Sequence, residues 1–309
     1  MTGMAAWGLT HDDELSSWHS CANSHRLMMR LALRLPCEAI MRRMYLLVLC
    51  FLALGLDRDA AAETAATCPN SPLAAEASSL EKEQLDELLS QQATACVKEG
   101  KPALAVALLT EVIRHAPTDA AAYLNRGSAQ ATAGEVTLAL GDYTTALHLN
   151  PNLVEAWYDR GTTYLHLRRY ESAIADFTGA LSLRPDFALA YCNRGLANLQ
   201  LGRYDDALAD YSVAIDKDAA ISRCYFNRGN LYLILGEYQK AIDDFTEALA
   251  SEKDAIALSR RGQAYEALNQ RSQALDDYNA ALSLNHNLES AEEGQARIMA
   301  GNQESEQKK

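Results

Sequence analysis

The small and hydrophobic residues of this chain recur about every 34 residues from Gly127 to Ala281. Each copy of the pattern has a glycine, an alanine twelve residues later, an aromatic residue four further on and a second alanine three beyond that. The glycines are Gly127, Gly161, Gly195, Gly229 and Gly262; the first alanines are Ala139, Ala173, Ala207, Ala241 and Ala274; the aromatic residues are Tyr143, Phe177, Tyr211, Phe245 and Tyr278; and the second alanines are Ala146, Ala180, Ala214, Ala248 and Ala281. A fixed period of this length predicts a stack of similar structural units.

The residue types in the pattern predict two packed helices in each unit. Two helices approach to about 8 Å only where the side chains at their crossing are small. We expect the glycine of the first helix and the alanines of the second to form this crossing, with the missing side chain of Gly195 facing Ala207. The aromatic residues then fill the volume around the crossing, and each unit leaves an apolar face for the next unit to cover. The pattern therefore predicts an all-α solenoid.

Charged residues follow the same period. An arginine precedes each glycine, and an aspartate precedes each of the aromatic residues. We predict that the arginine and aspartate of one unit, such as Arg194 and Asp210, form a partly buried ion pair between its two helices. Such pairs fix helix register more than they add stability. The alternative is a ligand site lined by the arginines.

With this pattern the chain resembles the tetratricopeptide repeat (TPR) family, whose unit of 34 residues has a large aromatic residue at position 4, glycine at 8, alanine at 20 and 27 and an aromatic residue at 24. Position 4 is matched by Tyr123, Trp157, Tyr191 and Tyr225, and Leu258 departs from it. The resemblance implies a right-handed superhelical α-solenoid of helix-turn-helix repeats. The signal-like segment described below would make this chain an exported member of bacterial type.

The repeat frame divides the chain into segments. The family often has proline at position 32 as well. We expect a degenerate first repeat, without the aromatic residues, because Ala93, Ala105 and Pro117 stand at positions 8, 20 and 32 one period before the first full repeat. The expected segments are 1–40, upstream of a true start at Met41 or disordered; 41–62, a signal peptide; 63–85, a linker; 86–119, the degenerate repeat; 120–153, 154–187, 188–221, 222–254 and 255–287, five full repeats; 288–300, a capping helix; and 301–309, a disordered tail.

The resemblance also implies a concave groove that is lined by the first helices and binds a segment of a partner protein. The Lys, Asn and Arg set with which some family members clamp a peptide carboxylate is incomplete here. Asparagine is a poor residue for a helix interior, so its recurrence at position 6 indicates either hydrogen bonds to a ligand backbone or bonds that brace a neighbouring helix. The candidate groove residues are Asn125, Tyr158, Asp159, Asn193, Arg223, Phe226, Asn227 and Arg260. Their mixed chemistry suits a segment with apolar anchors.

The net charge and the absence of known motifs argue against nucleic acid binding, catalysis and metal binding. The formal net charge is −13, which would repel nucleic acid phosphates. Catalytic and phosphate-binding motifs are absent from the sequence, and its histidines are scattered without metal-ligand spacing. We expect a non-enzymatic scaffold with a protein or peptide partner and without nucleic acid, small-molecule substrate, cofactor or metal. The alternatives are a cytosolic TPR scaffold and an accessory subunit of a hydrolase or transferase.

Residues 41–62 have the layout of a secretory signal. Met41-Arg42-Arg43 precede an apolar run over residues 44–56, and Ala60-Ala61-Ala62 follow it. The run is shorter than the roughly 20 residues that span a bilayer. We expect export to the periplasm and no membrane insertion after signal cleavage; the alternatives are a membrane anchor through residues 44–56 and a cytoplasmic location.

Cleavage of the signal would leave four cysteines, which allow three connectivities. They are Cys68, Cys96, Cys192 and Cys224. A disulfide between Cys68 and Cys96 would attach the leader to the first helix, and two free thiols are the alternative.

We predict that N-terminal sequencing of the native protein gives a start near Glu63, because cleavage after small residues removes the signal. A start at Met1 would contradict export and indicate the cytosolic scaffold. A start at Met41 would indicate that residues 44–56 are retained, either as a membrane anchor or as a buried core helix.

Overall fold

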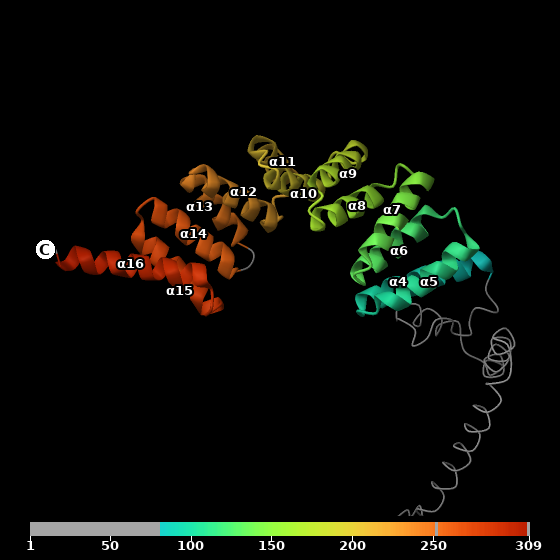
Figure 1. Cartoon of the computed structure of the whole chain (residues 1–309), viewed down its shortest axis with the longest axis horizontal. Coiled ribbons are helices and arrows are strands. Elements are labelled where there is room, and N and C mark those ends of the chain that lie inside the picture. Colours follow the sequence, from blue (N-terminus) through green and yellow to red (C-terminus); the bar gives the residue numbers. More distant parts are fainter. Residues whose placement is uncertain (1–80, 251–252, 308–309) are drawn as a thin grey trace, which may run out of the picture. The chain divides into compact units, whose positions relative to one another are not determined.

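The computed structural model describes residues 81–250 and 253–307, and this part of the chain holds thirteen α-helices and no strand (Figure 1). The signal-like segment 41–62 and Cys68 lie outside it. The helices are α4 (Lys82–Lys98), α5 (Pro102–His115), α6 (Ala120–Thr132), α7 (Val136–Leu149), α8 (Val154–His166), α9 (Tyr170–Leu183), α10 (Ala188–Gln200), α11 (Tyr204–Lys217), α12 (Ser222–Leu235), α13 (Tyr238–Ala248), α14 (Ala255–Ala267), α15 (Arg271–Leu284) and α16 (Glu289–Gln307).

The helices pack as consecutive pairs, from α4 with α5 to α14 with α15, and α16 packs on the last pair. The second helix of each pair contacts the first helix of the next. In addition, the first helices contact one another from pair to pair, from α4 with α6 through to α14 with α16. The predicted all-α solenoid is therefore confirmed, and its first helices form one continuous layer.

Both ends of the described helices differ from the expected boundaries. Helix α4 begins at Lys82, inside the expected linker 63–85. Helix α16 continues to Gln307, through residues that were expected to form a disordered tail. Glutamate and glutamine are good helix formers, and no proline interrupts them here, so the helix propagates beyond the last buried turn.

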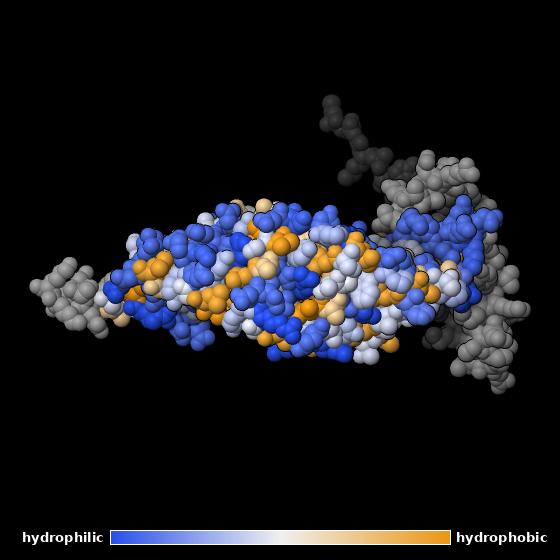
Figure 2. Space-filling model, turned by 90° about the horizontal axis from the view of Figure 1, so that it is seen from above, coloured by the Kyte–Doolittle hydropathy of each residue, from blue (hydrophilic) through white to orange (hydrophobic). Residues whose placement is uncertain are grey.

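The surface of the molecule is mixed in polarity. Figure 2 shows hydrophobic residues in small patches that are separated by hydrophilic ones. Scattered apolar surface of this kind is normal in folded proteins. Exposure alone therefore does not identify an apolar residue as functional, and its location on a particular set of helices is needed as well.

In the five pairs from α6 and α7 to α14 and α15, an aromatic ring of the second helix covers the glycine of the first. A Cβ atom added to Gly195 would lie 2.9 Å from Cε1 of Tyr211 and 3.2 Å from Cβ of Asp210. The expected neighbour, Ala207, is fully buried but is not the closest contact, because the ring one helical turn after it lies across the glycine. Four other pairs repeat this contact, as Gly127 with Tyr143, Gly161 with Phe177, Gly229 with Phe245 and Gly262 with Tyr278, whereas the pair of α4 and α5 has Ala93 at the equivalent position.

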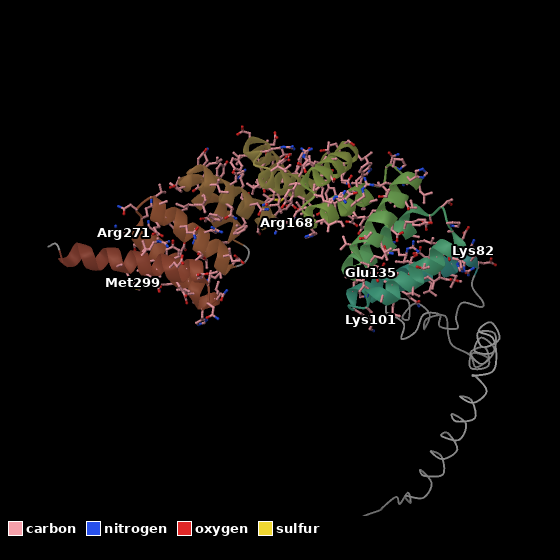
Figure 3. The ribbon with its side chains drawn as sticks, in the orientation of Figure 1. Lys82, Lys101, Glu135, Arg168, Arg271 and Met299 are labelled. Atoms are coloured by element: carbon pink, nitrogen blue, oxygen red, sulfur yellow. A yellow bond between two sulfur atoms is a disulfide. The ribbon has the colours of Figure 1, made fainter. Side chains whose placement is uncertain are left out.

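The turn between the two helices of a pair contains a residue in the left-handed backbone conformation. The turns contain Gly100, Gly134, Gly202 and Gly236, with φ between 72° and 82°. Glycine adopts this conformation without steric cost. The equivalent residues of two other turns are Arg168, with φ 57°, and Asn269, with φ 58°. Figure 3 labels Lys101, Glu135 and Arg168 at or beside three of these turns.

Each periodic arginine binds the aspartate of its own pair and a hydroxyl of the preceding pair. Arg194 donates to both carboxylate oxygens of Asp210, at 3.0 and 2.7 Å, and to Oγ1 of Thr178 at 3.1 Å. These bonds to aspartate raise the pKa of the guanidinium. We call this arrangement the arginine latch. The five latches are Arg126, Asp142 and Thr110; Arg160, Asp176 and Thr144; Arg194, Asp210 and Thr178; Arg228, Asp244 and Ser212; and Arg261, Asp277 and Thr246.

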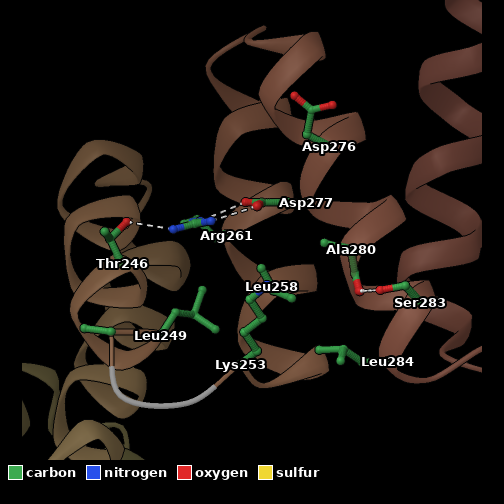
Figure 4. A pocket seen from close by; sticks show the side chains of 11 residues that line it. Thr246, Leu249, Lys253, Leu258, Arg261, Asp276, Asp277, Ala280, Ser283 and Leu284 are labelled. Carbon is green, nitrogen blue, oxygen red and sulfur yellow. Dashed lines mark hydrogen bonds and ion pairs between the residues drawn. The ribbon is translucent and has the colours of Figure 1, made fainter.

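The predicted ion pairs are thus confirmed, and the hydroxyl group is a third partner that was not predicted. The signal was present, because threonine or serine recurs with the same period in the second helices. Figure 4 shows the last latch, with Arg261 between Asp277 of its own pair and Thr246 of the preceding one. Each latch therefore joins three helices from two pairs.

We predict opposite effects for two glycine-to-alanine changes in helices. Gly195→Ala should destabilise the protein by about 1 to 3 kcal/mol, because its Cβ would overlap the ring of Tyr211. A Cβ on Gly141 of α7 would meet nothing within 4 Å, so Gly141→Ala should stabilise by roughly 0.5 to 1 kcal/mol through helix propensity. Chemical denaturation measures both, and equal or greater stability of Gly195→Ala would contradict the ring contact.

Candidate functional site

The eight candidate groove residues lie on the first helices of five consecutive pairs. They are Asn125 on α6; Tyr158 and Asp159 on α8; Asn193 on α10; Arg223, Phe226 and Asn227 on α12; and Arg260 on α14. Neighbouring first helices contact one another, so these residues lie along one layer. We call the surface of α6, α8, α10, α12 and α14 that carries them the first-helix face.

A chain of hydrogen bonds joins three first helices in the centre of this face. The Nδ2 atom of Asn193 donates to the Tyr158 hydroxyl at 3.1 Å, and Nη2 of Arg223 donates to Oδ1 of Asn193 at 3.1 Å. Asn193 is 5% exposed. Both functions of its amide are engaged within the protein, so Asn193 braces neighbouring helices.

A disulfide lies beside this chain of bonds. Cys192 of α10 is bonded to Cys224 of α12, with 5.7 Å between their Cα atoms. Both side chains are fully buried. The sequence left this pairing among three connectivities, although a separation of 32 residues in a period of 34 places the two cysteines near each other on adjacent first helices. Together the disulfide and the hydrogen bonds fix α10 against α12.

The expected disulfide at the start of the chain involves one described cysteine. Cys96 of α4 is buried and disulfide-bonded. Its expected partner, Cys68, lies outside the described residues, so the pairing of Cys68 with Cys96 stays a prediction.

The two aromatic candidates are partly embedded in the protein. The ring of Tyr158 lies 4.7 Å from that of Phe187 and 5.9 Å from that of Phe177. The guanidinium of Arg184 lies 4.9 Å from the centre of the Phe187 ring and also pairs with Glu155. The ring of Phe226 packs at 5.9 Å from Phe245. Replacement of either aromatic residue would therefore disturb packing as well as any ligand contact.

Other groups of the face are available to a ligand. Within the described part of the chain, the side chains of Asn125 and Asn227 make no hydrogen bond, and Arg260 bonds only to Gln263. The exposed aliphatic residues of the same helices include Leu189 at 38%, Ile234 at 60% and Ile256 at 50%. Each lies one or two helical turns from a candidate residue on its own helix, on the same side.

Asp159 is a half-buried carboxylate that only a hydroxyl stabilises. Ser128 donates to its Oδ2 atom at 3.0 Å, and the Tyr143 hydroxyl in turn donates to Ser128 at 3.4 Å. Burial raises the pKa of Tyr143 to about 12, so its hydroxyl is a donor at neutral pH. Burial also raises the pKa of the Asp159 carboxyl, against the lowering effect of the Ser128 bond. The five latch aspartates each have an arginine, whereas no cationic side chain of the described residues bonds to Asp159.

Two pockets lie between successive pairs, and each contains an arginine latch. The larger, of about 620 Å³, is lined by residues that include Arg261, Asp277 and Thr246 (Figure 4). The smaller, of about 320 Å³, contains Arg194, Asp210 and Thr178. The latch groups in both pockets are bonded to one another and are not available to a ligand. We therefore interpret these pockets as gaps between successive helix pairs and not as binding sites.

Residues 81–250 and 253–307 contain no candidate metal site and no candidate membrane span. Their histidine, cysteine and acidic side chains nowhere form a group of three or more that could hold a metal ion. None of their helices combines the length and the apolar character needed to cross a membrane.

Comparison with protein families gives matches over most of the helical part. One family model with the description tetratricopeptide repeat matches residues 91–154 and 158–220. Two further models with the same description match residues 222–253 and 255–287. No curated protein matches the chain.

Several solved structures share the fold. PilF from Pseudomonas aeruginosa is 19% identical with a TM-score of 0.64, over 70% of this chain and 99% of that chain. PilW, described as a widely conserved type IV pilus biogenesis factor, is 17% identical with a TM-score of 0.62, over 68% and 97%. YrrB, described as a TPR protein with an unusual peptide-binding site, is 22% identical with a TM-score of 0.53, over 61% and 97%.

We predict that Asp159→Asn is more stable than the wild type at pH 7. Because burial raises the folded pKa of Asp159, the folded protein binds this proton more tightly than the unfolded chain does. The resulting stabilisation is complete below the ordinary pKa of about 3.9 and is lost as the pH rises through the folded pKa. The neutral amide avoids this loss and still accepts the Ser128 bond, so the gain should shrink to nothing near pH 3. Asp243→Asn, which neutralises an exposed carboxylate of α13, is the control for net charge. Thermal melts over this pH range measure both, and a destabilised Asp159→Asn at pH 7 would contradict the burial cost.

Proposed function

Because the chain belongs to the tetratricopeptide repeat family, we propose that it is a non-enzymatic scaffold that holds a segment of another protein on its first-helix face. The observation that carries this proposal is that the face has polar and apolar groups without a partner in the protein. The face extends over five consecutive first helices. On it, the Asn125 and Asn227 amides have no hydrogen-bond partner in the described chain, and Ile234 and Ile256 are exposed to solvent.

These groups match the needs of a polypeptide ligand. An asparagine amide donates one hydrogen bond and accepts another, as a peptide backbone requires. Exposed aliphatic residues on neighbouring helices accept apolar anchors of an extended or helical segment. The solved TPR protein YrrB, which shares the fold, is described as having a peptide-binding site, and this supports a peptide-like ligand here.

The centre of the face is suited to hold its shape during binding. The disulfide between Cys192 and Cys224 and the bonds through Asn193 fix α10 against α12 in the free protein. A preorganised surface loses less conformational entropy on binding than a mobile one. Asn193 thus supports the binding surface, whereas Asn125 and Asn227 are the asparagines that contact the ligand.

We also propose that the mature protein functions outside the cytoplasm, in the periplasm. The signal-like segment 41–62 and the two buried disulfide-bonded cysteines of α10 and α12 support this location, because disulfides persist in oxidising compartments. The alternatives are a membrane anchor through residues 44–56 and a cytoplasmic scaffold.

We predict that Ile234→Ser weakens partner binding about tenfold or more, because it removes an apolar anchor site that is 60% exposed and contributes little to folding. The matched control is Leu138→Ser on α7, a second helix, where the side chain is 56% exposed. Calorimetry with a partner recovered by crosslinking in the native compartment measures both affinities. Loss of binding in Leu138→Ser together with normal binding in Ile234→Ser would place the partner on the second helices and contradict the proposal.

A further inference from the structure

Two adjacent repeats differ at a pair of equivalent positions on the first-helix face. Asp159 of α8 and Asn193 of α10 are one period of 34 residues apart, and so are Leu189 and Arg223. In the later repeat, Arg223 donates to the Asn193 amide at 3.1 Å. In the earlier repeat a carboxylate stands in the place of the amide, and a leucine stands in the place of the arginine. The charged Asp159 carboxylate therefore lacks an arginine of the protein itself, whereas the neutral Asn193 amide has one in Arg223.

The surroundings of Asp159 hold it in position without neutralising it. The relay from Tyr143 through Ser128 reaches Oδ2, and no bond to Oδ1 occurs within the described residues. Glu155, one turn earlier on α8, is engaged with Arg184 and adds negative charge nearby. A half-buried carboxylate without a counter-ion lowers stability, because no nearby positive charge offsets the loss of its hydration.

We propose that the bound partner segment carries a basic side chain that pairs with Asp159, in the place that Arg223 occupies against Asn193 in the next repeat. This inference rests on the proposed function, since it assigns chemistry to the ligand of the same face. Leu189 is 38% exposed and offers an apolar surface for the aliphatic stem of the side chain. Arginine fits better than lysine, because a guanidinium can bond to both the free Oδ1 and the Oδ2 atom.

The overall charge favours the same ligand. A chain with a net charge of −13 attracts a cationic segment at long range and repels an acidic one. The cation of Arg223 lies two first helices beyond Asp159, so an acidic or polar residue of the segment can follow the basic one along the face. The sequence preference expected of the ligand is therefore a basic residue near apolar anchors.

The first experiment uses a phage-displayed library of random peptides selected on the full chain. Selected peptides are synthesised with arginine and with citrulline, which has the same shape without the charge. We expect wild-type protein to bind the arginine peptide at least tenfold more tightly than the citrulline peptide. Asp159→Asn should bind the two peptides equally, which assigns the charge preference to this carboxylate.

The second experiment supplies the missing cation from the protein itself. Leu189→Arg should pair with Asp159 as Arg223 pairs with Asn193, so that Tm rises and affinity for the arginine peptide falls at least tenfold. The rise in Tm should disappear in the double variant Leu189→Arg/Asp159→Asn, which separates pairing with Asp159 from a general effect of the new arginine.

The outcomes separate this inference from the proposed function. If Ile234→Ser weakens the selected peptides but citrulline and Asp159→Asn change nothing, the face binds peptides and the basic-residue assignment is wrong. Selection of acidic or uncharged peptides on the face has the same meaning. If no peptide is selected, or if the selected peptides ignore Ile234→Ser and Leu189→Arg alike, the proposed function is contradicted and this inference is overturned with it.

Discussion

The structure depends on one steric constraint, which is that a ring of the second helix lies where a side chain of the first helix would begin. At Gly195 the gap to the Tyr211 ring is too small for even a methyl group. The constraint brings the backbones of each pair close together and buries the ring completely. It also sets the direction in which the remaining faces point. One face of the first helix is used within the pair, so the opposite side is left for neighbouring first helices and for a ligand.

The arginine latch extends this local contact into a stack. Its aspartate is the residue immediately before the ring on the second helix, so the packing of the ring also positions the carboxylate. The third partner, a hydroxyl on the preceding pair, converts an ion pair within one unit into a connection between units. At the C-terminal end an amide takes the role of the arginine, because Gln295 of α16 donates to Asn279 of α15 at 2.6 Å. The cap therefore repeats the connection without a charge.

The fold could be predicted from the sequence because its requirements are steric and strictly periodic. Gly195 tolerates no replacement by a larger residue without strain, and such positions show plainly in one sequence. The candidate site was less predictable, because a repeat position specifies a face and not a partner. Asn193 and Asn227 occupy the same position, yet the first is buried between Tyr158 and Arg223 and the second is unbonded within the described chain. The difference arises from Arg223 and from the disulfide beside it, neither of which recurs. Residues that break the period carry the individual properties of this protein.

The disulfide between α10 and α12 has a consequence for the way the array comes apart. In a repeat protein each unit contacts only its neighbours, so loss of structure can begin at either end and advance one unit at a time. A covalent bond between two inner units interrupts this progression, because fraying that reaches either unit cannot separate them. Under tension along the chain, the terminal pairs would extend while the two linked units stay together. In an oxidising compartment the ends of the array can thus be lost or proteolysed while its centre, with the middle of the first-helix face, persists.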